Sequence, residues 1–360
     1  MKVKIRIGNE VKEYTGAWED HTLLEVFQEL GITQVHAPCG GNGTCKKCLV
    51  TVEGLGEVLS CQTQCKDGMC VTVAEEQKSA IAENGNCYLY PADAGDGLLA
   101  ACDIGTTTVV CHLLDGATGV RLCTVSAPNA QRSFGADVIS RIQASVDSGL
   151  DKLQSAIVDQ INGMLVQLKQ KAGRTEDIRR LAVAGNTVMS HLFCGLSPES
   201  IGVAPFTPLS LFGESYDAKQ IGIEGCETVY VVPSIAGYVG GDIVADLAAV
   251  QMHSSVLAEA GEKETLMLDI GTNGEMVLGK SGSYVCCATA AGPAFEGAEI
   301  AMGMPAASGA ISKVWLDDGK ICCSTINDAP AVGICGSGLI DALAVFLETE
   351  LLDESDRGRG

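Results

Sequence analysis

Cysteines near the start of the chain have the spacing that most directly indicates chemistry. Cys39, Cys45 and Cys48 follow the pattern C-x5-C-x2-C in the segment HAPCGGNGTCKKCLVTV, and Cys61 follows after twelve intervening residues. A [2Fe–2S] cluster requires four thiolates, and one tight loop can supply several of them. The three glycines of this loop permit positive φ angles and let backbone N–H groups approach the sulfurs. The spacing therefore predicts a [2Fe–2S] cluster.

Zinc and unrelated thiols are the alternatives for this segment. Zinc sites usually combine two C-x2-C pairs, whereas this loop has one. The identity of the fourth cluster ligand stays open on spacing alone, because Cys65 and Cys70 lie close to Cys61 in the sequence. The pattern favours iron over zinc, with three candidates for the last thiolate.

Two copies of Asp-Ile-Gly-Thr form the second pattern that indicates chemistry. They lie in CDIGTTTVVCHLLDG (residues 102–116) and LDIGTNGEMVLGKSG (residues 268–282), and each pattern predicts a strand, a turn and a strand. Small residues at such a turn let backbone N–H groups bind phosphate, hydroxyls add donors, and a strand-end carboxylate can hold Mg²⁺ through water. The candidate residues are Asp103, Gly105, Thr106, Thr107, Asp269, Gly271, Thr272 and Asn273.

Two other segments carry polar residues directly after a predicted strand. In LAVAGNTVMSHLF (residues 181–193), Asn186 and Thr187 would face a γ-phosphate, although helix capping explains these residue types almost as well. In AGPAFEGAEIAMGM (residues 291–304), Glu296 or Glu299 could orient an attacking water, and solvated surface glutamates are the alternative.

The elements that must position these residues divide the chain into three parts. Residues 1–75 predict a strand at 2–7, an amphipathic helix at 21–30 and strands at 48–52 and 71–73, in an α+β module. Residues 76–97 lack a lasting period and read as a linker. From residue 98 to 360, β-type runs alternate with longer helical patterns, which indicates α/β architecture. The repeated hairpin predicts two lobes, at about 98–250 and about 262–360.

The composition excludes several partners. A formal net charge of −21 argues against nucleic acid, and no apolar stretch approaches the length of a membrane span. A cytoplasmic protein is therefore expected. Nine further cysteines lie mostly in apolar runs and are predicted to be mainly buried thiols: Cys102, Cys111, Cys123, Cys194, Cys286, Cys287, Cys322, Cys323 and Cys335.

Residues 1–75 resemble the β-grasp fold of plant-type and adrenodoxin-like [2Fe–2S] ferredoxins. The segment LSCQT around Cys61 is similar to the last-ligand segment of those proteins. The resemblance implies that the metal ligands are Cys39, Cys45, Cys48 and Cys61.

The paired hairpins resemble the two phosphate motifs of the actin, sugar-kinase and heat-shock chaperone ATPase superfamily. PSIAGYVGGDIVADLAA (residues 233–249) is similar to its first connecting helix, and GICGSGLIDALA (residues 333–344) to its adenosine motif. The resemblance implies a duplicated, actin-like (ribonuclease H-like) fold that binds ATP and Mg²⁺. Gly333, Gly336 and Ser337 would then contact the nucleotide. The implied catalytic residues are Asp103, Asp269, Asn186 and Glu296.

A ferredoxin-like module ahead of this ATPase fold resembles the reductive activators of corrinoid proteins. GADVISRI (residues 135–142), AGNTVMSHL and GPAFEGA (residues 292–298) are similar to stretches of that family. The resemblance implies an ATP-hydrolysing iron–sulfur reductase that passes one electron to Co(II) and regenerates Co(I) for methyl transfer. Its expected partners are a corrinoid protein of a methyltransferase system and an upstream electron donor, and a homodimer is allowed.

Three rival functions remain open, and the chain departs from the superfamily pattern in one respect. The rivals are a small-molecule kinase with a regulatory cluster (Glu296 or Asp242 as base), an electron carrier with a docking domain, and an activator of a radical dehydratase. The superfamily continues beyond its adenosine motif with a second connecting helix and further strands, whereas this chain ends sixteen residues after Ala344. We therefore expect the C-terminal part of the fold to be incomplete, which puts ATPase competence in question.

Overall fold

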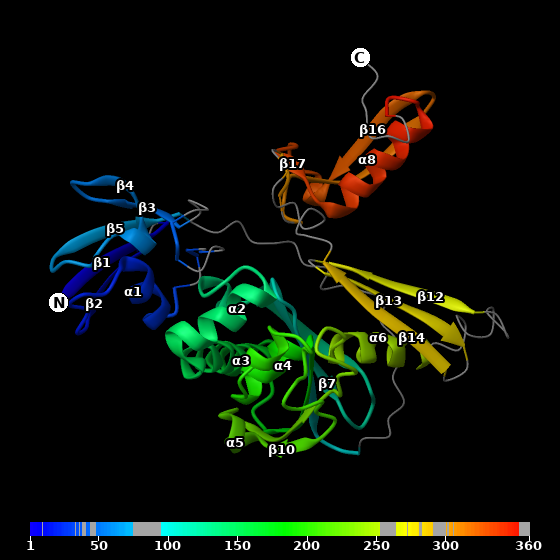
Figure 1. Ribbon diagram of the computed structural model, residues 1–360, viewed down its shortest axis with the longest axis horizontal. Helices are drawn as coiled ribbons and strands as arrows, with labels where there is room; N and C mark the ends of the chain where they lie inside the picture. The colour runs from blue at the N-terminus through cyan, green and yellow to red at the C-terminus, as the bar shows by residue number, and fades with distance from the viewer. Residues whose placement is uncertain are drawn as a thin grey trace. The chain divides into compact units, whose positions relative to one another are not determined.

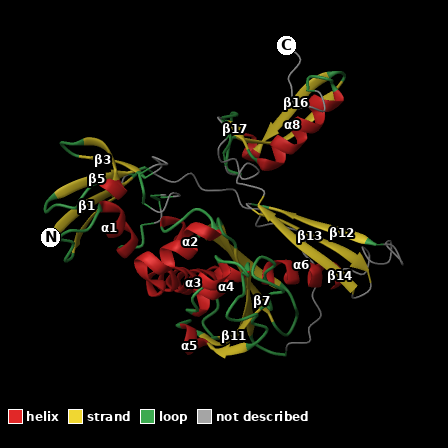
Figure 2. Ribbon diagram, in the orientation of Figure 1, coloured by secondary structure: helices red, strands yellow, loops and turns green. Residues whose placement is uncertain are grey.

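The computed structural model describes residues 1–74, 95–252, 264–290 and 300–352, apart from residues 9, 33, 36, 38–40, 44–47, 272, 281–282, 301 and 305. The chain divides into two compact units. Within the described part, the first unit holds residues 1–74 and 95–252, and the second holds residues 264–352. Figures 1 and 2 show the helices and strands of each unit.

Residues 1–74 of the first unit form a five-stranded sheet with one helix. The strand order is β2-β1-β5-β3-β4, with β1 and β5 parallel. Thr22 and Glu25 form a capping box at the start of the helix, which buries Leu23, Val26 and Phe27 in the core of this module. The elements are β1 (Lys2–Ile7), β2 (Glu10–Thr15), α1 (Leu23–Glu29), β3 (Leu49–Val52), β4 (Gly56–Leu59), the 3₁₀ turn η1 (Ser60–Gln62) and β5 (Met69–Val73).

A six-stranded sheet organises residues 98–231 of the same unit. Its order is β10-β11-β9-β6-β7-β8, in which β6, β9 and β11 are parallel to one another and the β6–β7–β8 meander is antiparallel. The strands are β6 (Leu98–Ile104), β7 (Thr108–Asp115), β8 (Arg121–Pro128), β9 (Ile178–Gly185), β10 (Ser215–Asp217) and β11 (Cys226–Val231). Since the carboxyl ends of parallel strands share one edge, the loops after β6, β9 and β11 meet there.

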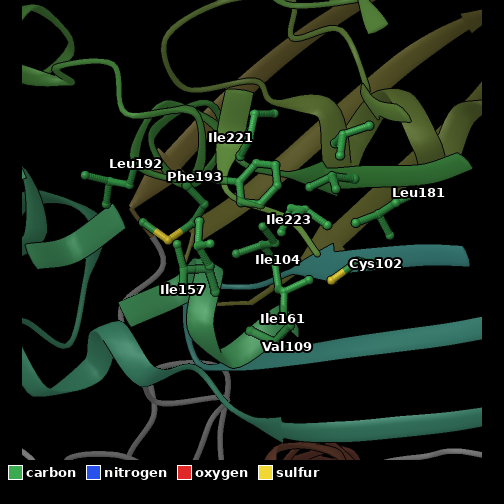
Figure 3. Packing of buried hydrophobic residues seen from close by; sticks show 14 of the residues in the cluster. Cys102, Ile104, Val109, Ile157, Ile161, Leu181, Leu192, Phe193, Ile221 and Ile223 are labelled. Carbon is green, nitrogen blue, oxygen red and sulfur yellow. The ribbon is translucent and has the colours of Figure 1, made fainter. Parts of the chain in front are cut away.

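Helices cover this sheet and complete its core. The long α3 packs across β7 and β8 and against α4, and it places Leu153, Ile157, Ile161 and Leu165 at helical spacing toward the core. Figure 3 shows Ile157 and Ile161 among the residues that surround Ile104 of β6. The helices are α2 (Val138–Ala144), α3 (Leu150–Ala172), α4 (Thr187–Cys194), α5 (Ala218–Ile221) and α6 (Gly241–Met252).

In its described residues, the second unit contains two three-stranded sheets and a helix. One sheet has the order β12-β13-β14 and the other β16-β15-β17, and α8 packs on β15. The elements are β12 (Thr265–Ile270), β13 (Asn273–Lys280), β14 (Ser283–Ala290), β15 (Ala310–Asp317), β16 (Lys320–Thr325), β17 (Gly333–Ile334) and α8 (Gly336–Glu348). Both predicted Asp-Ile-Gly-Thr hairpins are thus antiparallel strand pairs, β6–β7 and β12–β13. The exact domain boundaries stay a prediction.

The expectation of buried thiols is only partly right. Cys102, Cys111 and Cys335 are buried, whereas Cys287 and Cys323 are exposed. Each exposed cysteine adjoins a second cysteine in the same strand. Successive side chains of a strand point to opposite faces, so one member of each such pair faces outward where only one face is covered. Among the described residues, no helix combines the length and apolar character needed to cross a bilayer.

Candidate cluster and nucleotide sites

The β3–β4 hairpin brings two of the predicted cluster ligands together. Cys48 directly precedes β3, and Cys61 lies in the 3₁₀ turn that follows β4. Leu49 pairs with Leu59 in the antiparallel register, and the N–H of Ser60 donates to the carbonyl of Cys48 at 2.9 Å. Cys48, just before Leu49, and Cys61, two residues after Leu59, therefore lie side by side. The Sγ atoms of Cys48 and Cys61 are 3.3 Å apart.

This distance fits a shared iron. Two thiolates bound at about 2.3 Å to one tetrahedral metal lie roughly 3.8 Å apart, so a small side-chain rotation would satisfy both bonds. Both cysteines are buried in the core of the module, which shields the site from water. Cys39 and Cys45 lie outside the described residues, so the complete ligand set stays a prediction.

The competing fourth ligands have other surroundings. Cys65 donates its backbone N–H to the carbonyl of His21 at 2.8 Å, and burial raises the pKa of its thiol, which favours the protonated form. Cys70 lies within β5, where it faces Lys4 of β1 in the parallel register. Cys61 is the candidate whose sulfur contacts that of Cys48, and this contact supports it as the fourth ligand.

The first Asp-Ile-Gly-Thr hairpin places its turn at the edge where the parallel strands end. Asp103 is the penultimate residue of β6 and is exposed, whereas Ile104 is buried. The turn comprises residues 105–107, and β7 begins at Thr108. A Cβ atom at Gly105 would lie 2.7 Å from the carbonyl oxygen of Thr108, so the tight turn requires glycine.

Three side chains from other elements hold this turn. Asn129, just after β8, donates from Nδ2 to the carbonyl of Gly105 at 2.8 Å, and its backbone N–H donates to the carbonyl of Thr107 at 2.9 Å. Arg141 of α2 donates from Nη2 to the carbonyl of Thr106. Asn186 donates from Nδ2 to Thr106 Oγ1 at 3.1 Å. The turn is therefore fixed by hydrogen bonds before any ligand binds.

Sequence reasoning missed Asn129 and Arg141. Arg141 is fully buried, and its Nε also donates to the carbonyl of Gly135 at 3.0 Å. Asn129 is nearly as buried, and its Oδ1 accepts the N–H of Gln131 at 2.8 Å. The only sequence signal for Arg141 was that it is a charged residue within the segment GADVISRI. The sequence alone does not show that this arginine points into the protein.

Asn186 combines the two interpretations that the sequence left open. It is the N-cap of α4, where its Oδ1 accepts the N–H of Met189 at 2.9 Å, so helix capping belongs to Asn186 and not to Thr187, which is the first residue of the helix. The same side chain also contacts the hairpin turn through Thr106. Thr187 is fully buried and donates from Oγ1 to the carbonyl of Ala236 at 2.6 Å, which leaves it a structural role. A contact between Asn186 and a γ-phosphate stays a prediction.

The loop after β11 reaches the same edge through a glycine. A Cβ atom at Gly240 would lie 2.4 Å from the Cα of Asn186, so only glycine lets the start of α6 approach the cap of α4. The structure shows that Gly240 serves a contact within the first unit. Asp242, the rival kinase base, accepts the N–H of Ile243 at 2.9 Å in the first turn of α6.

The second hairpin places two carboxylates on the same face. Asp269 is penultimate in β12, as Asp103 is in β6, and it pairs with Glu275 of β13. Directly opposed residues of antiparallel strands point to the same face, so these acidic side chains are neighbours. Burial raises the pKa of Asp269. Glu275 is a residue that sequence reasoning missed, and it is largely buried.

The remaining predicted nucleotide residues lie in the second unit. Gly271 donates its N–H to the carbonyl of Asn273 at 2.9 Å, which closes the turn. Gly333 lies in β17 and Gly336 is the first residue of α8. Ser337 donates from Oγ to the carbonyl of Ser312 at 3.0 Å, so its hydroxyl already has a partner. Thr272, Glu296 and Glu299, for which roles were also predicted, lie outside the described residues.

Comparisons with known proteins match most of the chain, and the matched domains follow the expected order. Residues 6–76 match a 2Fe-2S iron-sulfur cluster binding domain, residues 98–255 the RACo middle region, and residues 263–359 the C-terminal domain of RACo, the ASKHA domain. The corrinoid activation enzyme RamQ of Eubacterium limosum is 32% identical over 93% of this chain and 69% of its own length. The chain belongs to the family of corrinoid reductive activators.

Two other comparisons agree with this membership. A solved structure titled reductive activator for corrinoid, iron-sulfur protein superposes with a TM-score of 0.62 at 30% identity, and the match covers 99% of this chain and 74% of that chain. The [Co(II) methylated amine-specific corrinoid protein] reductase of Methanosarcina barkeri is 28% identical over 71% of this chain and 51% of its own length. The predicted fold, a ferredoxin-like module with an actin-like domain, is thereby confirmed for this corrinoid activator.

Proposed function

We propose that this chain reductively activates a corrinoid protein in an ATP-dependent reaction, in which one electron converts Co(II) to Co(I). The observation that carries the proposal is the order of its parts. A cysteine pair able to share an iron precedes a preformed Asp-Ile-Gly-Thr turn, and this combination matches a corrinoid activation enzyme over nearly the whole chain.

The cysteine site accounts for the redox half of the reaction. Cys48 and Cys61 would hold one side of a [2Fe–2S] cluster, which supplies single electrons at low potential. Their burial excludes water from the sulfurs, and the backbone hydrogen bond between Ser60 and Cys48 keeps the pair together. We propose that a separate electron donor delivers electrons to this site.

The hairpins account for the ATP half of the reaction. Plant-type clusters have potentials near about −400 mV, and Co(II) in a corrinoid is expected to be harder to reduce, so electron transfer requires coupled energy. Gly105 to Thr107 would contact phosphate oxygens, and Asp103, near the end of the preceding strand, would hold Mg²⁺ through water. Asp269 has the corresponding position in the second hairpin, and we propose the same chemistry for it within that hairpin. Nucleotide binding would thus select one conformation of the protein, and its hydrolysis would release that conformation.

The other predicted features are consistent with this role. We propose that the protein acts in the cytoplasm, where a reducing environment keeps cysteine thiols available for a cluster. Asn186, Gly333, Gly336 and Ser337 remain proposed nucleotide contacts. A homodimer also remains a prediction.

ATP hydrolysis measured with and without a Co(II) corrinoid protein tests the proposal. We expect the corrinoid protein to stimulate hydrolysis, with all of the γ-phosphate of the consumed ATP recovered as inorganic phosphate. Phosphoryl transfer to a small acceptor, with no response to the corrinoid protein, would instead establish the small-molecule kinase.

A further inference from the structure

Gln62 connects the cysteine loop to a cluster ligand. Its side chain Nε2 donates to the carbonyl of Gly41 at 2.9 Å, and the same nitrogen lies 3.7 Å from Sγ of Cys61, within hydrogen-bonding distance of sulfur. An amide nitrogen carries two hydrogens, so one group can serve both acceptors. Gln62 follows Cys61 in the 3₁₀ turn η1, so its backbone is fixed next to the ligand.

A glycine makes room for this arrangement. A Cβ atom at Gly43 would lie 3.2 Å from Cγ and 3.3 Å from Cδ of Gln62, which is tighter than an ordinary contact. Gly43 also has a φ of 74°, a conformation that L residues rarely adopt. Gly41 lies against Cys61, since a Cβ there would be 3.8 Å from Cβ of Cys61. The Gln62 side chain therefore crosses the glycine loop at close range.

An N–H donor beside a thiolate ligand affects the reduction potential in a known direction. Reduction adds an electron and makes the cluster and its ligands more negative. A hydrogen bond to the ligand sulfur therefore stabilises the reduced state more than the oxidised state and raises the potential. Hydrogen bonds to charged groups are also stronger than those between neutral groups.

We propose that Gln62 is a positioning residue that holds the glycine loop against Cys61 and raises the reduction potential of the cluster through its side-chain N–H. The inference rests on the predicted cluster and on Cys61 as its ligand, and it does not depend on the corrinoid partner. A redox titration can therefore contradict the role of Gln62 while the proposed function stands. Equally, the proposed function can be wrong while Gln62 still raises the potential.

Redox titration of the full chain, loaded with its cluster and followed by electron paramagnetic resonance of the reduced state, tests the proposal. The Gln62→Leu and Gln62→Met variants replace the amide with an apolar side chain of similar size and so remove the donor. We expect both to lower the ratio of reduced to oxidised cluster about tenfold at a fixed potential, which corresponds to a downward shift of 59 mV.

Gln64→Leu is the matched control, because Gln64 is an exposed glutamine two positions further along the same segment. Its potential should equal that of the wild type. Potentials of the two Gln62 variants that match the Gln64→Leu control would overturn the proposal. Failure of both Gln62 variants to assemble a cluster that Gln64→Leu assembles would also overturn it, because Gln62 would then act on assembly alone.

Discussion

Polar side chains fix the Asp-Ile-Gly-Thr turn of the first unit, and each acts through one or two atoms. Arg141 donates to the carbonyl of Thr106, Asn129 to that of Gly105, and Asn186 to the hydroxyl of Thr106. With its carbonyls occupied in this way, the turn keeps its conformation when phosphate is absent. Nucleotide binding then costs less ordering of the loop, which is a gain in affinity through preorganisation.

The Arg141→Lys variant tests this preorganisation. Lysine keeps the charge but lacks the planar fork of donors that reaches Gly135 and Thr106 together. Since loss of a hydrogen bond made by a charged group costs about 1.5–3 kcal/mol, we expect the Kd for ATP to rise at least about tenfold. Isothermal titration calorimetry measures this Kd. Arg180→Lys, at an exposed position of β9, is the control, and equal Kd values for the two variants would contradict the role of Arg141.

Asp269 illustrates the opposing demands of stability and function at one residue. Burial raises its pKa, so the folded protein disfavours the ionised carboxylate that Mg²⁺ binding requires. A group with a raised folded pKa stabilises the fold only while it is protonated. That contribution is present below the unfolded pKa of about 3.9 and is lost as the pH rises through the folded pKa.

The Asp269→Asn variant should therefore unfold at a higher temperature than the wild type at pH 7 without nucleotide. The difference should disappear once the pH falls below the unfolded pKa of aspartate, about 3.9, because both side chains are then neutral. Thermal denaturation across this pH range measures the effect, with Asp317→Asn at an exposed position of β15 as the control. A lower melting temperature of Asp269→Asn at pH 7 would show that the carboxylate stabilises the fold.

At the scale of elements, strand register determines which cysteines meet. Pairing of Leu49 with Leu59 leaves Cys48 and Cys61 at the open end of the β3–β4 hairpin. A shift of one residue would turn every side chain of the strand to the other face and separate the sulfurs. The helix α1 packs against the turn η1 that carries Cys61, and the N–H of Leu23 donates to the carbonyl of Thr63 at 2.8 Å. Cys61, the predicted fourth ligand, is thus held by helix and hairpin together.

Serine substitutions distinguish the candidates for the fourth ligand. We expect Cys61→Ser to abolish or strongly perturb the visible absorption of the [2Fe–2S] cluster, because a hydroxyl is a poor substitute for a thiolate. Cys65→Ser and Cys70→Ser should keep the wild-type spectrum and iron content. An unchanged spectrum of Cys61→Ser, together with loss of the cluster in one of the other variants, would show that the cysteine replaced in that other variant is the fourth ligand.

The same elements show what sequence could predict and what it could not. The strand–turn–strand pattern around each Asp-Ile-Gly-Thr was predictable, because small turn residues and alternating apolar residues are local signals. The partners of the first turn were not predictable, since Asn129 and Arg141 are 24 and 35 residues away from the groups that they bind. The pairing of Glu275 with Asp269 depends on strand register, and local composition does not reveal it.

At the scale of the whole molecule, the parts combine an electron source with an ATP-binding domain. Neither part alone indicates a corrinoid partner. A ferredoxin-like module could serve many acceptors, and the actin-like fold supports many reactions. Their fusion in one chain, matched over 93% of its length by a corrinoid activation enzyme, specifies the acceptor class. In the proposed reaction, ATP drives electron delivery to cobalt.

The coupling of ATP to cobalt reduction can be measured in anaerobic solution. Absorbance follows the reduction of Co(II) to Co(I) in a corrinoid protein after the cluster has been chemically reduced. We predict rapid formation of Co(I) with ATP and Mg²⁺ and little without them. The Asp103→Ala variant should keep its cluster spectrum and lose the ATP-dependent rate. Reduction at the full rate without ATP, or an undiminished rate in Asp103→Ala, would contradict the account.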